Sequence, residues 1–414
     1  MTTEFHKEDF FDPQVVECPF AYYQRARAEA PVMPLRAADS DQQIYLVTTF
    51  EAVERVLKTP EVFSNQFMNP VGRDKTDADV QAIYDDGWPW VDTLLTSDPP
   101  QHRRYRVLVN RAFTAKRVRA LEPYITTLAN ELVDRFIGDG ACEFVSAFAR
   151  PLPLRVIADQ FGVPDRDLDN FKRWSDSFVA RLGGMLSKEE ELDCARDVVR
   201  LQKYLKSRID ERRASPTEDI MSALVHAEDE GAPALSDGEL INMLPQLLVA
   251  GNETTANTLA GGLMDLLRNP EQLAAVQADP ALIGGLVEES LRMVTAQSGM
   301  WRIATQDTTL AGTDIPAGAT ILLRYDAANR DPARFDAPEA FDICRANAGT
   351  HLSFGIGIHF CVGAQLARKE LEIGFKVLLA RLKNLRLSPD NDFTHQPNMM
   401  LRGLKRLNIT FEAG

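Results

Sequence analysis

Residues 351–363 read HLSFGIGIHFCVG and place a single cysteine, Cys361, among three glycines and two histidines. Glycine is used where φ must be positive or where the backbone must approach a flat ligand closely. The residues that follow, 362–382, repeat apolar side chains at three- and four-residue intervals and predict a helix. Unpaired amides and the helix dipole at a helix N-terminus lower the pKa of a thiol. The stretch therefore predicts a loop that holds a thiolate.

The composition limits the classes of partner. The chain has 414 residues, of which 45% are hydrophobic, and can bury a large core. Its 46 basic and 60 acidic side chains give a net charge of −14, which disfavours nonspecific binding to nucleic acid or to an anionic membrane. Residues 1–14 are charged and lack the apolar segment of a secretory signal, and no later apolar run is long enough to span a bilayer. A cytoplasmic protein is predicted.

The cysteine pattern argues against a disulfide scaffold or a structural zinc site. The five cysteines are odd in number, widely scattered and without CxxC pairs: Cys18, Cys142, Cys194, Cys344 and Cys361. The first four are expected to be small apolar side chains. At most one cysteine is expected to do chemistry.

Helical periodicity dominates the chain and predicts a mainly α fold with small β-sheets (α+β). Apolar residues recur at helical spacing through 14–30, 115–136, 167–182, 190–212, 237–268, 279–294 and 362–382. Short β-branched or alternating runs predict strands at 44–48, 303–310, 320–323 and 407–411. This order does not resemble alternating βαβ units.

The helix predicted over 237–268 is unusually long. Ser236 and Glu239 have the spacing of a capping box, and Asn269-Pro270 predicts the end of the helix. A helix of this length spans roughly 45 Å at 1.5 Å per residue. Pro245 is expected to kink the helix or to separate its first two turns.

The stretch Phe354-Gly-Ile-Gly-Ile-His359-Phe-Cys361-Val-Gly363 resembles the haem-binding signature of the cytochromes P450, with Phe, Gly, Gly, His, Cys and Gly at the family's spacing. The resemblance implies haem b with the Cys361 thiolate as axial ligand of the iron. It also implies that Phe354, His359 and Gly363 bind the cofactor. The implied fold is that of a cytochrome P450, in one domain over 1–414 with a helix-rich core and an N-terminal β-rich part. The haem would lie between the long central helix and the cysteine loop.

Within the long helix, Ala250-Gly251-Asn-Glu253-Thr254 resembles the oxygen-activation motif of the same family. Gly251 removes a side chain where a diatomic ligand must fit, and a Thr254 hydroxyl bonded to a carbonyl one turn back would open the helix. The resemblance places Ala250 and Gly251 at the cofactor and makes Glu253 and Thr254 the catalytic pair that delivers protons.

Glu289-Ser-Leu-Arg292 places opposite charges three residues apart on a predicted helix. The resemblance makes them a buried structural ion pair that supports the cysteine loop. The family's third member, an arginine or histidine, is replaced here by Ala340. Either Arg345 or another nearby cation substitutes for it, or the pair stands without a third partner.

Haem propionates in a buried site require cations. The resemblance assigns this role to four residues. His102 and Arg106 lie four apart on a predicted helix, Arg302 begins a predicted strand, and His359 precedes the cysteine by two residues.

The activity implied by the resemblance is that of a haem-thiolate monooxygenase, with electrons from a separate ferredoxin or flavodoxin. No GxGxxG segment in the setting of a dinucleotide fold is found in the chain. Such carriers are usually acidic, and a run between Asp98 and Glu122 without acidic residues offers a complementary surface. This basic cluster comprises Arg103, Arg104, Arg106, Arg111, Lys116, Arg117 and Arg119.

Pocket candidates follow from the resemblance and are mostly apolar, so a terpenoid, steroid or other hydrophobic small molecule is favoured over a charged one. They are Trp88, Trp90, Leu94, Phe178, Leu182, Leu247, Ala250, Gly299, Met300, Trp301, Met399, Met400 and Leu401.

Three other functions agree less well with the sequence. A peroxide-driven peroxygenase would not need Glu253 and Thr254, and a non-catalytic haem-thiolate sensor would not need a donor surface. A cysteine hydrolase would need a base, an orienting group and an oxyanion site near Cys361. His351 and His359 do not supply that set from the sequence alone.

Overall fold

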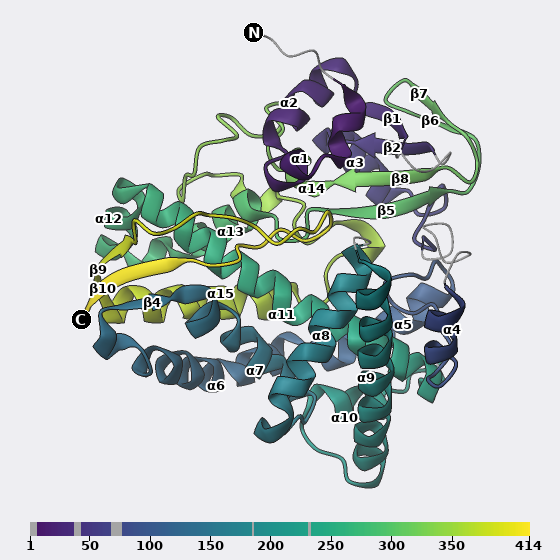
Figure 1. The fold of residues 1–414 in the computed structure, drawn as a ribbon, viewed down its shortest axis with the longest axis horizontal. Helices are drawn as coiled ribbons and strands as arrows, with labels where there is room; N and C mark the ends of the chain where they lie inside the picture. The colour runs from purple at the N-terminus through teal and green to yellow at the C-terminus, as the bar shows by residue number, and fades with distance from the viewer. Residues whose placement is uncertain (1–5, 37–42, 68–76, 184–185, 231–232) are drawn as a thin grey trace. The chain divides into compact units, whose positions relative to one another are not determined.

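The structure is a computed structural model that describes residues 6–36, 43–67, 77–183, 186–230 and 233–414. The chain divides into two compact units. Unit 1 comprises 1–71, 260–361 and 387–407, and unit 2 comprises 72–259, 362–386 and 408–414. The single domain over 1–414 stays a prediction from the sequence. The mainly helical fold with small sheets is confirmed (Figure 1).

Unit 1 is built on a five-stranded sheet in the order β1-β2-β8-β5-β3. The strands are β1 (Val32–Arg36), β2 (Gln43–Val47), β3 (Phe63–Ser64), β5 (Gly299–Ala304) and β8 (Thr320–Arg324), and β6 (Thr308–Leu310) pairs separately with β7 (Thr313–Ile315). Only β2 and β8 run parallel among these neighbours, in the register Ile44 to Thr320. The strand predicted over 303–310 is wrong, since β5 ends at Ala304 and β6 begins after a turn.

Unit 1 also contains several helices. They are α1 (Pro13–Glu17), α2 (Phe20–Glu29), α3 (Phe50–Lys58), α12 (Pro270–Ala278), α13 (Ile283–Val294) and α14 (Tyr325–Ala328). Helix α3 buries Val53, Val56 and Leu57, which recur at helical spacing, against Val47 and Leu323 of the sheet. The apolar face of α3 therefore anchors the C-terminal end of this helix to the sheet. This is the end of α3 that contacts the cysteine loop.

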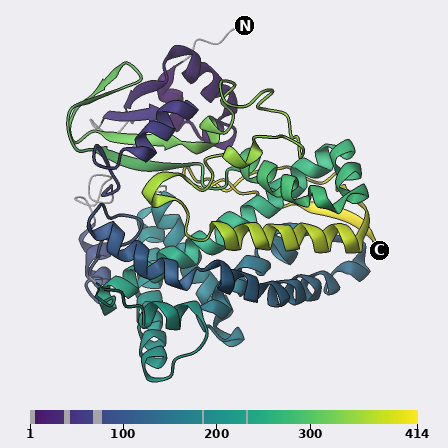
Figure 2. The same ribbon diagram turned by 180° about the vertical axis from the view of Figure 1, so that it is seen from behind.

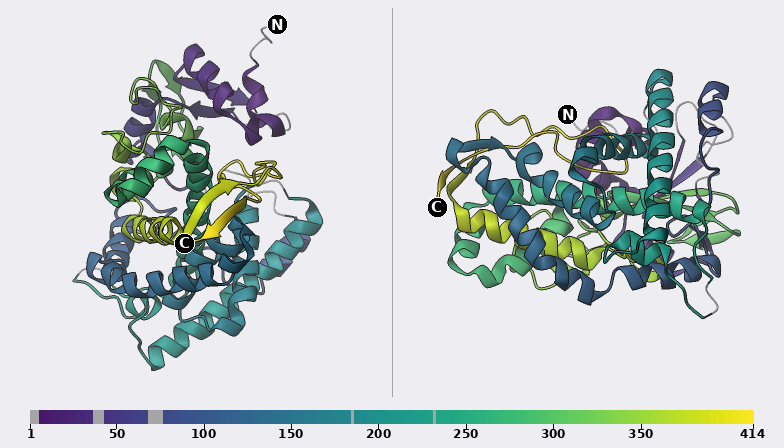
Figure 3. Two further views of the ribbon diagram at one scale, coloured as in Figure 1. Left: turned by 90° about the vertical axis from the view of Figure 1, so that its left-hand side faces the viewer. Right: turned by 90° about the horizontal axis from the view of Figure 1, so that it is seen from below.

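Unit 2 is mostly helical. Its helices are α4 (Ala78–Tyr84), α5 (Gln101–Ala112), α6 (Ala115–Asp134), α7 (Pro151–Gln160), α8 (Leu168–Gly183), α9 (Lys188–Ala214), α10 (Ile220–Val225) and α15 (Ala364–Arg381). In Figure 2, α15 (yellow-green) runs beside α6 (blue). The strands β4 (Ala141–Glu143), β9 (Leu382–Leu387) and β10 (Asn408–Ala413) form a small sheet whose β9 and β10 appear in yellow in Figure 3.

Helix α11 (Asp237–Arg268) has the boundaries predicted from the sequence. The capping box is confirmed, because the Glu239 amide donates to Ser236 Oγ and the Ser236 amide donates to the Glu239 carboxylate. Pro245 does not separate the first two turns, since the helix continues through it. No helix of the described residues is long and apolar enough to cross a membrane.

Candidate functional site

The cysteine loop of unit 1 is held by its own backbone and by α3. The Cys361 amide donates to the Phe354 carbonyl at 2.9 Å, which closes the loop. Gly355 and Gly357 have φ values of +61° and +75°. A Cβ added at Gly357 would lie 2.5 Å from the Leu57 carbonyl oxygen of α3, so only glycine fits there. The backbone around the half-buried Cys361 is thus held in one conformation by these contacts. Cys361 lies three residues before α15 begins.

The α11 segment in unit 2 has the local bond that the sequence predicted. Thr254 Oγ1 donates to the Ala250 carbonyl at 2.8 Å, one turn back. Leu248 and Val249 are buried, whereas Ala250 is exposed and Thr254 is partly exposed. A small residue and an alcohol, one turn apart, are therefore both accessible on this part of the helix.

Glu253, next to Thr254, is a mostly buried carboxyl. Burial raises its pKa above the ordinary value, and the charge of Asp176 adds to that rise, while Arg150 and Lys172 oppose it. A raised pKa favours the protonated carboxyl, which is the form that gives up a proton. Glu253 and Thr254 are thus an acid and an alcohol side by side.

Sequence reasoning missed a second acid next to this segment. Glu370 of α15 is 2% exposed, and burial raises its pKa to about 8, although a hydrogen bond with Thr255 opposes the rise. Its carboxyl is therefore largely protonated at neutral pH. The available signal was its position between Leu366 and Ile373, at helical spacing on the buried face.

The Glu289 and Arg292 pair of α13 is fully buried in unit 1. Arg292 Nε and Nη2 donate to the two Glu289 carboxylate oxygens at 2.8 and 2.7 Å. Arg345 Nε also donates to Glu289 Oε1, at 3.1 Å. Arg345 therefore takes the third place, while the Ala340 carbonyl accepts from both arginines.

The four residues assigned to the propionates come from three segments. His102 and Arg106 lie on α5 of unit 2, Arg302 lies on β5 of unit 1 with 3% exposure, and His359 lies in the cysteine loop. Burial, with the charge of Arg106, lowers the pKa of His102 to about 4. His102 is therefore a neutral hydrogen-bond donor at pH 7, and the arginines carry the positive charge.

Unit 2 contains a cavity of about 380 Å³. Three of the pocket candidates, Trp88, Trp90 and Phe178, line it together with α4, α8, α9 and α11. The Gln202 and Asn242 side chains bond the backbone of Trp88 and Pro89 and thereby hold this aromatic wall in place. The volume falls within the range of about 300–1,000 Å³ that is usual for small-molecule sites.

The remaining pocket candidates have different surroundings. Leu247 is buried in the unit 2 core, where Leu94 packs against it, and the Leu182 side chain lies outside the described part of the chain. In unit 1, Gly299 and Met400 are buried, and Met300, Trp301 and Met399 pack against core clusters.

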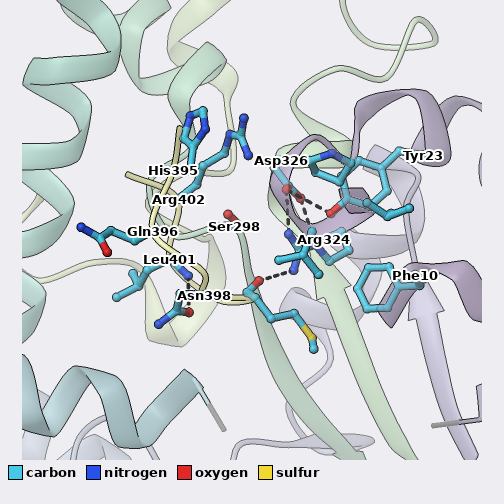
Figure 4. A pocket seen from close by; sticks show the side chains of 14 residues that line it. Phe10, Tyr23, Ser298, Arg324, Asp326, His395, Gln396, Asn398, Leu401 and Arg402 are labelled. Atoms are coloured by element: carbon cyan, nitrogen blue, oxygen red, sulfur yellow. Dashed lines mark hydrogen bonds and ion pairs between the residues drawn. The ribbon is translucent and has the colours of Figure 1, made fainter. Parts of the chain in front are cut away.

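A second, smaller pocket in unit 1 is lined by a hydrogen-bonded network that connects distant segments of the chain (Figure 4). Tyr23 Oη and Arg324 Nη2 both bond Asp326 Oδ2, at 3.1 and 2.7 Å, and Arg324 Nη1 donates to the Met399 carbonyl. Leu401 lines this pocket. Its volume of about 20 Å³ is enough for a water molecule but not for a substrate.

The side chains of the site suit a cofactor that supplies most of the ligands of its own metal better than they suit a free metal ion. No group of three or more His, Cys, Asp or Glu side chains within the described ranges is arranged to hold a metal. A single half-buried thiol on a glycine loop would give a metal one soft ligand and leave the others to the cofactor.

The basic cluster is partly neutralised by the surrounding helices. Arg104 pairs with Glu239, Arg111 pairs with Asp229, and Arg117 donates to backbone carbonyls of residues 218 and 219. Three other members are exposed: Arg103, Lys116 and Arg119. The positive surface is therefore smaller than the sequence suggested.

Comparisons with known proteins give consistent results. The family profile described as "Cytochrome P450" matches residues 186–411. Cytochrome P450 monooxygenase PikC of Streptomyces venezuelae is 39% identical and covers 96% of this chain and 92% of its own length. Steroid C26-monooxygenase of Mycobacterium tuberculosis is 37% identical, with 94% and 93% covered.

Solved structures agree with these relatives. CYP109E1 from Bacillus megaterium in complex with testosterone superposes with a TM-score of 0.81 at 32% identity, and 95% of this chain and 99% of that chain are covered. Cytochrome P450 CYP109Q5 from Chondromyces apiculatus gives a TM-score of 0.85 at 34% identity, with 97% of each chain covered.

Proposed function

The chain belongs to the cytochrome P450 family and is a P450 monooxygenase, and we propose that it inserts one oxygen atom of O₂ into a hydrophobic small molecule. Electrons would come from a separate ferredoxin or flavodoxin, in the cytoplasm. The observation that carries the proposal is the cysteine loop, because its glycine backbone and single thiol suit a thiolate ligand.

We assign haem b as the cofactor. When bound, it supplies the binding and activation of dioxygen, which side chains cannot provide. Cys361 would ligate its iron, and Phe354, Gly363, Ala250 and Gly251 would contact the cofactor. Arg106, Arg302, His102 and His359 are the proposed propionate donors, and the two arginines would supply the positive charge.

The proposed proton path begins at Glu253 and Thr254. Burial raises the pKa of Glu253 and so favours the protonated form of its carboxyl, and the Thr254 hydroxyl is fixed by its bond to the Ala250 carbonyl. Since that bond uses the hydroxyl hydrogen, the Thr254 oxygen is left on its other side as an acceptor for a hydrogen bond from a proton carrier.

The proposed substrate class is a ring-containing hydrophobic molecule. Relatives are named for steroid oxidation, and one solved neighbour holds testosterone. The aromatic wall formed by Trp88, Trp90 and Phe178 supports a rigid, apolar substrate body for this chain as well.

Replacement of Cys361 by serine tests the proposal. Wild-type protein purified with haem, reduced with dithionite and exposed to carbon monoxide should show the strongly red-shifted Soret band of thiolate ligation. Cys361→Ser should lose that band and at least about 99% of turnover, since a serine hydroxyl does not replace a thiolate at neutral pH. The exposed Cys344 provides a matched control, and Cys344→Ser should keep the wild-type spectrum. An unchanged spectrum in Cys361→Ser would refute the assignment.

Charge reversal on α6 tests the donor surface. Lys116→Glu should slow reduction by an acidic ferredoxin by about threefold at low salt, and the difference should shrink as salt screens the encounter. Lys383 is a matched control because it lies near the far end of α6, where Arg381 pairs with Asp134. Equal reduction rates for Lys116→Glu, Lys383→Glu and wild type, measured by stopped flow, would place the donor elsewhere.

A further inference from the structure

Within the described residues, some polar side chains that line the 380 Å³ cavity in unit 2 are hydrogen-bonded to other protein groups, and one is not. The Gln202 and Asn242 amides are used by the backbone of Trp88 and Pro89. The carboxylate of Asp85 accepts a hydrogen bond from Gln81 at 2.8 Å. These groups hold the walls in place and leave one cation of the lining, Arg181, for a ligand.

Arg181 is held by a ring rather than by a carboxylate. Its guanidinium carbon lies 4.3 Å from the centre of the Tyr84 ring, which also lines the cavity. Within the described ranges, no carboxylate pairs with it and no hydrogen bond uses its donors. Two nearby arginines have a carboxylate partner, unlike Arg181. Arg173 of α8 and Arg200 of α9 both pair with Asp197.

A guanidinium stacked on an aromatic ring keeps its planar edge available for two parallel hydrogen bonds. A carboxylate is the group that matches this edge in both charge and geometry. The lining also includes the Asp85 carboxylate and the amides of Gln81, Gln202 and Asn242. Its remaining residues are apolar or aromatic, with Trp88, Trp90, Phe178 and Val198 among them. A ligand that satisfies both features has a hydrophobic body and one acidic end.

We propose that Arg181 binds the carboxylate of a hydrophobic acid, so that the substrate of this enzyme is apolar apart from one negative charge. This proposal rests on the monooxygenase function and on use of this cavity by the substrate. It changes the expectation from the sequence, which favoured an uncharged molecule. The aromatic wall receives the substrate body, and the stacked guanidinium fixes its orientation.

The test uses two acids with their methyl esters, abietic acid for a ring body and dodecanoic acid for a chain. Each is titrated into ferric holoenzyme, and the Kd is read from the shift of the Soret band. At least one acid should bind about tenfold or more tightly than its ester, since hydrogen bonds to charged groups are worth about that factor or more. Equal affinities in both pairs, or no binding of either acid at millimolar concentration, would overturn the proposal.

Variants identify the residue responsible. Arg181→Gln should weaken acid binding about tenfold and leave ester binding unchanged, and Arg181→Lys should retain part of the preference. Arg173→Gln is the matched control on the same helix, because its side chain is occupied by Asp197. If Arg181→Gln keeps the acid preference, the proposal fails. The carbon monoxide spectrum separates this failure from failure of the proposed function, since that spectrum does not depend on Arg181.

Discussion

Arg292→Ala is expected to lower the free energy of unfolding by about 3–5 kcal/mol, the usual cost of breaking a buried ion pair from one side. Both Arg292 and Glu289 are fully buried. Arg292 also donates to the carbonyls of Asn329, Pro338 and Ala340, so its removal leaves several buried acceptors without their donor. The network joins α13 to the 329–340 segment, and its loss should therefore disturb the part of unit 1 that precedes the cysteine loop.

Urea unfolding followed by circular dichroism measures this loss. Lys58→Ala is a suitable control, because Lys58 pairs with Glu54 on the surface of α3 in the same unit. Exposed pairs contribute less than about 1 kcal/mol, so this variant should unfold near the wild-type midpoint. A similarly small effect of Arg292→Ala would mean that Arg345 alone compensates Glu289 and that the assigned network is not what stabilises the segment.

The sequence predicted best the features that depend on spacing along the chain. The boundaries of α11 follow from a capping box and a proline, which act within a few residues. The bond from Thr254 to the Ala250 carbonyl is also local, because both residues lie on one turn. The first two turns of α11 stay helical despite Pro245, since burial on neighbouring turns outweighs one lost backbone bond.

Features that depend on distant segments were predicted less well. Arg345 was one of several candidates for the third place at Glu289, and only the fold brings it within 3.1 Å. The basic cluster carries less positive charge than predicted, because two of its members pair with Glu239 and Asp229. Both acids lie more than a hundred residues away in sequence. Arg181 carries no motif, and its position over Tyr84 arises from tertiary packing.

The buried carboxyl of Glu370 is expected to make the free energy of unfolding depend strongly on pH. Burial raises its pKa to about 8 in the folded chain, whereas an unfolded glutamate titrates near its ordinary value of 4.5. Between these two values the folded state keeps a proton that the unfolded state releases. The contribution of Glu370 is therefore fully present below pH 4.5 and is lost as the pH rises, by about 1.4 kcal/mol per unit, until the pH passes 8.

Glu370→Gln should remove this dependence, because glutamine has the shape of the protonated acid and can still bond Thr255. The variant should match wild type near pH 4.5 and be more stable by about 5 kcal/mol above pH 8, as measured by urea unfolding across that range. Glu372, two residues further along α15, pairs with Lys369 at the surface and provides the matched control. Glu372→Gln should follow the wild-type profile, since an exposed carboxylate has little to lose on ionisation. If wild type and Glu370→Gln lose stability in parallel as the pH rises, the buried proton is not on Glu370, and another acid must account for the slope.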